Sequence, residues 1–419
     1  MRSLSTCIAL SVLFSVIFLS LPPVMAQTFT VIHNFTGGAD GAHPEGPLAI
    51  NTAGILYGTT SLGGTGNGGV FKLTYKGGNW VLIPPYDFHG GSDGANPNGG
   101  VIIGSDGTLY GTTTSGGGRG SCGDNGCGTV FHLRPPASVC KTARCPWTET
   151  VLYRFGGADG ANPEVGSLIF DPTGNLYGTT INGGLYGYGA VYELTPTRGG
   201  WTESILYSFT GGADGDGPWN GVVMDPAGNL YGTTLYAGDL SCTNPSGFGC
   251  GTVFQLTPSA DGWIENTLYT FQGLNDGGVP SGGVILDQTG NLYGATQYGG
   301  TGNGGTVFEL SPFNGSWSFT LLYPLDGIGG PPGSLVMDSA GNLYGATDED
   351  GEGGREGGTI FELTHSGSGW TYISLHGFTG GLDGSQPEGG VVVDANGNIF
   401  GTASAGGAYG YGVVFEISP

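Results

Sequence analysis

A Gly-Gly-x-Asp-Gly segment recurs along the chain and supplies the carboxylates that could do chemistry together. Its aspartates are Asp40, Asp93, Asp159, Asp214 and Asp383, with Asp276 in a looser copy, and glutamates follow three of them at Glu45, Glu164 and Glu388. Carboxylates around one rim could bind Ca²⁺, a hard cation that takes about six to eight oxygen ligands. An aspartate before glycine also commonly bonds its own backbone and shapes a turn. Because the segment is copied in nearly every repeat, we favour the turn and keep a Ca²⁺ site as the alternative.

Residues that depart from the repeat are better candidates for a specific ligand site. Trp219 follows Pro218, at the place where other repeats carry a glutamate. A charged loop with Asp348, Asp350 and Arg355 replaces a glycine-rich loop of the sixth repeat. This loop could contact a ligand, although an acidic run is also typical of a solvated surface segment.

Tyrosines gather in the loops that should connect the second and third strands of each repeat. They are Tyr186, Tyr188, Tyr236, Tyr298, Tyr409 and Tyr411. Rigid amphipathic rings on a polar rim suit stacking against sugar rings. Packing between neighbouring loops is the alternative role for them.

Sets of residues for nucleophilic or acid–base catalysis are weak in this sequence. The six histidines are scattered, and no Gly-x-Ser-x-Gly elbow occurs. The glycine-rich loops do not join a strand to a helix, so they do not indicate a phosphate cradle. A pair of rim carboxylates could still act on glycosides, but sequence spacing does not show such a pair.

A second motif sets the architecture that must position these residues. Its clearest copy is Gly-Asn-Leu-Tyr-Gly-Thr-Thr at 174–180, and the motif returns seven times at intervals of 51 to 67 residues. Its aromatic residues are Tyr57, Tyr110, Tyr177, Tyr231, Tyr293, Tyr344 and Phe400. Periods in this range indicate solenoids or propellers.

Each repeat contains four short strand signals. In the third repeat they are 167–170, 176–180, 190–194 and 201–209, rich in β-branched and aromatic residues and bounded by Gly, Pro, Asn and Asp. Four antiparallel strands in about 50 residues are typical of a propeller blade. Blades packed radially cover one another's faces, which supplies the core.

The two ends of the chain indicate how the ring closes. The segment 28–35 has the pattern of a fourth strand, and 413–417 has that of a third strand. Pairing them completes the last repeat and hides its open edge. We therefore predict an all-β fold, one seven-bladed β-propeller domain at 27–419, with 28–35 as the outer strand of the blade that contains 391–417.

The first residues predict export. Arg2 precedes an apolar stretch at 7–21, and the small residue Ala26 suits cleavage. The stretch is too short for a confident spanning helix. We predict a signal peptide at 1–26 that is cleaved near Ala26, and a secreted chain with no membrane span.

Six cysteines follow the signal and lie as close sequence neighbours. The pairs are Cys122 with Cys127, Cys140 with Cys145, and Cys242 with Cys250. An even number in an exported chain predicts disulfides, and we favour these local pairings. A zinc site is the weaker reading, because no pair has C-x₂-C spacing.

The charge balance limits the partners. Ten Lys plus Arg against 33 Asp plus Glu give a net charge of −23. Nucleic acid needs a basic surface, so it is a poor partner, and anionic membranes are equally poor. The acidic balance favours solubility and cation binding, and we expect a monomer.

The segments at 156–164 (Gly-Gly-Ala-Asp-Gly-Ala-Asn-Pro-Glu) and 174–180 resemble the GloVer (Gloeo/Verruco) tandem repeat of exported bacterial proteins. The resemblance extends over essentially the whole mature chain and implies an extracellular or surface location. Members often end in a C-terminal sorting or anchoring signal, whereas this sequence stops at Ser418-Pro419, so free secretion is expected. The family brings no known activity and no catalytic residues.

Two functions are compatible with these patterns. We favour a non-catalytic extracellular binding or interaction module that recognises carbohydrate or another protein with its top-face loops, where the tyrosines gather. The alternative is an extracellular enzyme, a lyase, hydrolase or lactonase that acts on sugars with a divalent metal at the channel mouth. The fold alone does not decide between them.

Overall fold

The structure is a computed structural model that describes residues 27–118, 120–136, 147–242, 248–325, 329–330, 333–348, 357–367 and 369–419. The predicted signal peptide at 1–26 lies outside the described residues. So do Cys140 and Cys145, and so do Asp350 and Arg355 of the charged loop.

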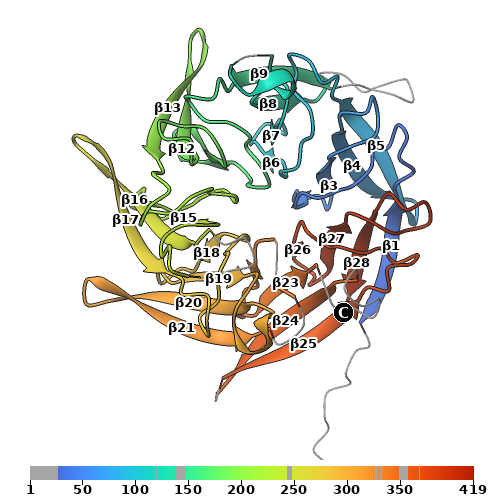
Figure 1. The fold of residues 1–419 in the computed structure, drawn as a ribbon. Helices are drawn as coiled ribbons and strands as arrows, with labels where there is room; N and C mark the ends of the chain where they lie inside the picture. Colours follow the sequence, from blue (N-terminus) through green and yellow to red (C-terminus); the bar gives the residue numbers. More distant parts are fainter. Residues whose placement is uncertain are drawn as a thin grey trace, which may run out of the picture.

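The described residues form seven four-stranded antiparallel sheets that follow one another around a ring, which confirms the predicted seven-bladed propeller (Figure 1). The inner strands are β2 (Ala49–Ile50), β6 (Ile102–Ile103), β10 (Ile169–Phe170), β14 (Val223–Met224), β18 (Val284–Leu286), β22 (Val336–Met337) and β26 (Val391–Val393). The second strands are β3 (Leu56–Thr60), β7 (Leu109–Thr113), β11 (Leu176–Thr180), β15 (Leu230–Thr234), β19 (Leu292–Thr296), β23 (Leu343–Thr347) and β27 (Ile399–Ala403). We number the blades 1 to 7 in this order.

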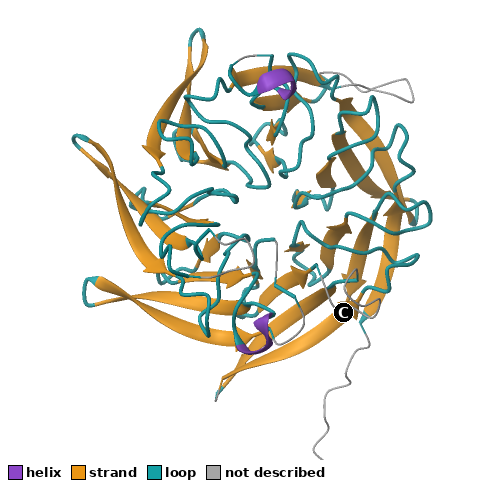
Figure 2. Cartoon of the chain, viewed as in Figure 1, coloured by secondary structure: helices purple, strands orange, loops and turns teal. Residues whose placement is uncertain are grey.

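The third strands are β4 (Gly69–Lys76), β8 (Thr129–Arg134), β12 (Ala190–Thr197), β16 (Thr252–Ser259), β20 (Thr306–Phe313), β24 (Thr359–Ser366) and β28 (Val413–Ser418). The outer strands are β5 (Asn79–Asp87), β9 (Thr148–Arg154), β13 (Gly200–Ser208), β17 (Gly262–Thr270), β21 (Ser316–Pro324), β25 (Gly369–Gly377) and β1 (Thr28–Asn34). Two 3-10 turns, η1 (Gly123–Asn125) and η2 (Thr301–Asn303), are the helical segments of the described chain, which is otherwise strands and loops (Figure 2).

The ring closes as the strand phase predicts. Strand β1 pairs with β28 in antiparallel register, with Thr28 opposite Ser418 and Phe29 opposite Ile417. The sheet order β1-β28-β27-β26 makes the N-terminal strand the outer strand of blade 7. Figure 1 shows the blue β1 beside the dark red β28. The closure supplies the last blade with the strand that its own repeat lacks.

The burial of each strand follows its place in the blade. Every residue of the second strand β11 is buried, since neighbouring blades cover both faces of the sheet there. The outer strand β13 alternates between exposed and half-buried residues over its first half, as expected for a strand with one face in water. Between the inner and second strands, Asp171 accepts bonds from the backbone N–H of Thr173 (2.8 Å) and Asn175 (2.9 Å), which fixes the tight turn.

Neighbouring blades are joined by a repeated aromatic contact. A fully buried phenylalanine at the end of an outer strand meets the third-strand aromatic ring of the next blade, edge to face, with centroids 5.0–5.3 Å apart. The pairs are Phe35–Phe71, Phe88–Phe131, Phe155–Tyr192, Phe209–Phe254, Phe271–Phe308 and Phe378–Phe415. Leu325 takes the place of the phenylalanine between blades 5 and 6, where it shares a cluster with Phe361.

The third-strand ring fits because the second strand has a glycine opposite it. A Cβ on Gly232 would lie 2.6 Å from the ring of Phe254, its cross-strand partner. This close approach explains the invariable Tyr-Gly or Phe-Gly step in the seven motifs of this chain.

Tryptophans at or near the start of the outer strands pack against the motif aromatic of the preceding blade. Ring centroids of such pairs lie 5.8–6.5 Å apart in Trp80–Phe400, Trp147–Tyr57, Trp201–Tyr110 and Trp317–Tyr231. Trp263 and Trp370 pack into the clusters that contain Tyr177 and Tyr293. Six of the seven tryptophans of the chain therefore serve the blade interfaces, and Trp219 is the exception.

Two of the three predicted disulfides are present. Cys122 pairs with Cys127 beside η1, and Cys242 pairs with Cys250 in the loop after β15. The third predicted pair lies outside the described residues. Within the described chain, no helix has the length and apolar character needed to cross a bilayer.

The blade-joining rings should dominate stability. We expect Phe209→Ala to lower the free energy of unfolding by about 3–5 kcal/mol, because it leaves a cavity between blades 3 and 4. Phe313→Ala is the matched control, since Phe313 is 65% exposed at a hairpin tip, and it should change stability little. Urea unfolding followed by tryptophan fluorescence measures both. Equal losses in the two variants would contradict the role given to the interface.

Candidate functional site

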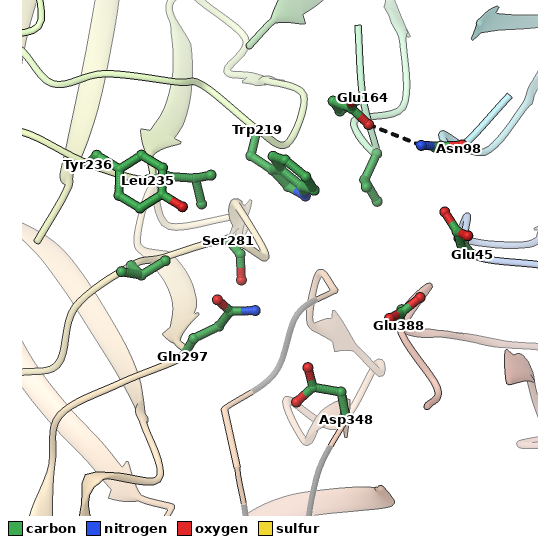
Figure 3. Close-up of a pocket in the computed structure, with 12 residues that line it drawn as sticks. Glu45, Asn98, Glu164, Trp219, Leu235, Tyr236, Ser281, Gln297, Asp348 and Glu388 are labelled. Carbon is green, nitrogen blue, oxygen red and sulfur yellow. Dashed lines mark hydrogen bonds between the residues drawn. The ribbon is translucent and has the colours of Figure 1, made fainter. Parts of the chain in front are cut away.

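One side chain per blade, placed directly after a proline of the top loop, faces the ring axis in six blades. These residues are Glu45, Asn98, Glu164, Trp219, Ser281 and Glu388, and all six line one cavity of about 440 Å³ (Figure 3). We call them the mouth ring. Blade 6 has Gly333 at the equivalent position. Each of these six repeats therefore places one residue, whose type varies between blades, at the cavity on the ring axis.

The backbone before each mouth-ring residue is held in an uncommon conformation. The residue before the proline has a left-handed backbone in each of the six loops: His43 (φ 52°), Asn96 (54°), Asn162 (55°), Gly217 (66°), Val279 (57°) and Gln386 (57°). For a β-branched residue such as Val279 this conformation is a genuine outlier. Strain of this kind persists only where the surroundings hold it. Here the N–H of Val279 donates to the Cys250 carbonyl (2.9 Å), and its carbonyl accepts from Gln297 (3.0 Å).

A second set of residues, at the position that follows each second strand, completes the wall. Leu235, Gln297 and Asp348 occupy this position in blades 4, 5 and 6 and line the cavity. In blade 1, the Ser61 hydroxyl donates to Glu45 (2.8 Å). Glu164 accepts from the side-chain amide of Asn98 (3.1 Å). The polar residues of the wall thus orient the glutamates.

The cavity has an acidic half and an apolar half. Glu45, Glu164, Glu388 and Asp348 supply the carboxyl groups. Leu235 and Tyr236 lie on the same side as Trp219, opposite Glu45 and Glu388 (Figure 3), and Val279 also lines the cavity. Such a mixture of an aromatic surface and a few placed polar groups is typical of small-molecule sites.

Close backbone contacts next to the mouth ring fix its spacing. A Cβ on Gly46 would lie 2.7 Å from the backbone oxygen of Asn98 in the next blade. The Thr59 hydroxyl donates to the Gly99 carbonyl across the same interface (2.8 Å). The glycine after Glu45 is therefore required by the approach of two blades, and the side chains above it cannot spread apart.

Burial and mutual repulsion perturb the mouth glutamates. Burial raises the pKa of Glu388 to about 7, and the charges of Glu45 and Asp348 add to the effect, while a bond from the Ser404 side chain opposes it. Burial also raises the pKa of Glu164, against hydrogen bonds from Asn98 and Thr114 that lower it. Glu388 therefore gains or loses its proton near neutral pH.

The six rim aspartates serve their own loops. Asp214 accepts from the backbone N–H of Thr210 (2.8 Å) and the hydroxyl of Tyr207 (3.0 Å). The other five, Asp40, Asp93, Asp159, Asp276 and Asp383, likewise accept a backbone N–H three or four residues earlier and a Tyr or His from the preceding strand. In the part of the chain that the structure describes, no group of three or more His, Cys, Asp or Glu is arranged to hold one metal ion. The Ca²⁺ site on the rim stays a prediction.

The predicted tyrosines occupy four kinds of place. Tyr236 lines the cavity. Tyr188 and Tyr411 pack over Gly211 and Gly37 of the neighbouring loops, as the packing alternative predicts. Tyr186 (55% exposed) and Tyr409 (61%) face solvent, and Tyr298 is half-buried in blade 5.

The structure adds cavity residues that sequence reasoning did not single out. They are Asn98, Val165, Leu235, Val279, Ser281 and Gln297. The signal that could have found Asn98 and Ser281 is their alignment with Trp219 after the loop proline. Of the predicted site residues, the structure brings Trp219, Tyr236 and Asp348 together.

Glu388 should make stability depend on pH. Its folded pKa lies above its ordinary value of 4.5, so ionisation costs the folded state more than the unfolded one. Stability should fall as pH rises through about 7, by on the order of 2 kcal/mol from this group. Glu388→Gln removes that part of the fall, measured by urea unfolding at about pH 5 and pH 8. Glu309→Gln, on a third strand far along the blade, is the control and should keep the wild-type profile. An unchanged profile in Glu388→Gln would contradict the assignment.

Comparisons with known proteins agree with the fold. Polysaccharide lyase Uly1 is similar with a TM-score of 0.51 at 12% identity, covering 90% of each chain. The extracellular domain of BT4673 from B. thetaiotaomicron gives 0.54 at 11% identity, with 93% of this chain and 40% of that chain covered. Such likeness shows the propeller alone, and curated protein sequences give no match. The model of the Gloeobacter/Verrucomicrobia repeat matches residues 16–239, 120–330 and 240–419. The chain therefore belongs to the Gloeobacter/Verrucomicrobia repeat family.

Proposed function

We propose that this protein is a non-catalytic extracellular binding module whose mouth cavity takes a sugar unit of a glycan. The observation that carries the proposal is Trp219, which faces a set of carboxyl groups across the cavity instead of joining two blades. A flat indole offers a surface for the apolar face of a sugar ring, and carboxylates accept hydrogen bonds from its hydroxyls. The two disulfides support a location outside the reducing cytosol.

The shape and composition of the wall suit this ligand. A volume of about 440 Å³ lies within the range of small-molecule sites, roughly 300–1,000 Å³. Asn98, Ser281 and Gln297 add amide and hydroxyl groups between the two halves. A sugar needs hydrogen-bonding partners around its edge and an apolar partner on its face, and this wall supplies both.

Binding should depend on Trp219 and not on the exposed tyrosines. We expect Trp219→Ala to weaken binding of the glycan identified on an array by about thirtyfold or more, since truncating a central aromatic contact costs ~2 kcal/mol. Tyr409→Ala is the matched control, because Tyr409 is exposed on the same face but does not line the cavity. Calorimetric titration of the two variants measures the difference. If Tyr409→Ala weakens binding as much as Trp219→Ala, the site is the loop surface and not the mouth.

An enzyme that acts on sugars is the second candidate, and Glu388 favours it. Burial and the nearby charge of Glu45 raise the pKa of Glu388 to about 7, which suits a general acid. Such an enzyme should release reducing ends from a polysaccharide, and Glu388→Gln should abolish the release. The assay is run with added Ca²⁺ and with a chelator, which also tests the metal. If glycans that bind give no product in either condition, the enzyme is excluded and the binding module is the remaining candidate.

A further inference from the structure

Within the described part of the chain, acidic side chains of the cavity wall are not matched by basic ones. Among the described residues that line the cavity, four are acids and none is Lys, Arg or His. The glutamates come from three blades, and the charge of Glu45 contributes to the raised pKa of both Glu164 and Glu388. A positive charge in the cavity would relieve this repulsion, so the site favours a cationic ligand over a neutral or anionic one.

The described carboxyl groups of the mouth come from different blades and do not form a set of three around one point. No three of the described acidic, His or Cys residues are placed to hold a single metal. Glu45 and Glu388 come from the adjoining blades 1 and 7, while Glu164 comes from blade 3. An extended organic cation can reach such separated groups, which a bare ion cannot.

The remaining wall distinguishes an amino sugar from a basic peptide. A lysine side chain would use the carboxyl groups but would leave Trp219, Ser281 and Gln297 without a ring or hydroxyl to contact. Asn98 lines the cavity and its side-chain amide donates to Glu164 (3.1 Å), so this wall holds an amide beside a carboxyl group at the polar edge. A sugar ring with an amino group matches the aromatic face, the polar edge and the acidic half together.

We propose that the mouth cavity selects glycans with free amino groups, such as glucosamine oligosaccharides without N-acetyl groups. This inference rests on the sugar-binding function proposed above. An ammonium group meets Glu45 and Glu388, the ring stacks on Trp219, and the hydroxyls bond the polar edge. An N-acetyl group would remove the charge that the acidic half favours.

The test compares ligands of equal length on the whole protein. Glucosamine, N-acetylglucosamine and uronic acid oligosaccharides are titrated by calorimetry at about pH 7, at which Glu388 is partly ionised and the amines are partly protonated. We expect about tenfold or greater preference for the free amine over the N-acetyl form. The double variant Glu45→Gln/Glu388→Gln should remove the preference, so that the free amine and the N-acetyl form bind with similar affinity.

The control variant is Glu193→Gln/Glu309→Gln, which removes two charges from third strands outside the cavity. Blade 4 naturally has Gln255 at this strand position, so the substitutions copy a residue that the blade accommodates. The control should retain the wild-type preference. If it loses the preference, overall charge causes it and the inference is overturned.

The other outcomes separate the two proposals. Equal or tighter binding of the N-acetyl form, still dependent on Trp219, overturns the amine selectivity and leaves sugar binding intact. Failure of every sugar to bind overturns both. A further outcome is that oligolysine binds as tightly as the amino sugar, with an affinity that Trp219→Ala does not change. That result would show that the acidic half binds a basic peptide, and it also overturns the inference.

Discussion

The edge-to-face contact between an outer-strand phenylalanine and the third-strand ring of the next blade sets the geometry of this propeller. It recurs at nearly the same centroid separation in six interfaces, from Phe35–Phe71 to Phe378–Phe415. The ring occupies the space over the second-strand glycine, so neighbouring blades meet at one fixed distance and angle. Aromatic pairs prefer this arrangement over face-to-face stacking. Every blade is therefore presented to the axis in the same orientation.

Because the blades are uniform, residues that hold the fold together can be told apart from residues that line the cavity. Residues that repeat, such as the rim aspartates and the blade-joining tryptophans, bond to their own loop or to the next blade. Residues that differ from blade to blade, Trp219 among them, gather at the axis and line one cavity. The packed blades hold these positions in place, while the residue type at each position can vary. Binding sites commonly lie on such loops of a rigid scaffold.

The sequence was sufficient for the fold but only partly for the site. Seven motifs and the unpaired strand types at the ends determine the blade count and the closure, because a propeller repeats one local pattern. Trp219 was found because it breaks the repeat. Leu235 and Gln297 were not found from the sequence. Their approach to Trp219 depends on which strand ends face the axis, and residue spacing along the chain does not show this. The structure shows the rim aspartates bonding their own loops, as Asp214 does with Tyr207, whereas a Ca²⁺ site on the rim stays a prediction.

Ring closure creates the acidic half as well as the last blade. Glu388 belongs to the final repeat and Glu45 to the first, and they become neighbours only because β1 pairs with β28 and brings blade 7 against blade 1. Their repulsion contributes to the raised pKa of Glu388. Bringing the two carboxyl groups close together therefore makes the free energy of ring closure less favourable. A bound cation would recover that cost. The same strand pairing that stabilises the ring therefore prepares its mouth for a positively charged ligand.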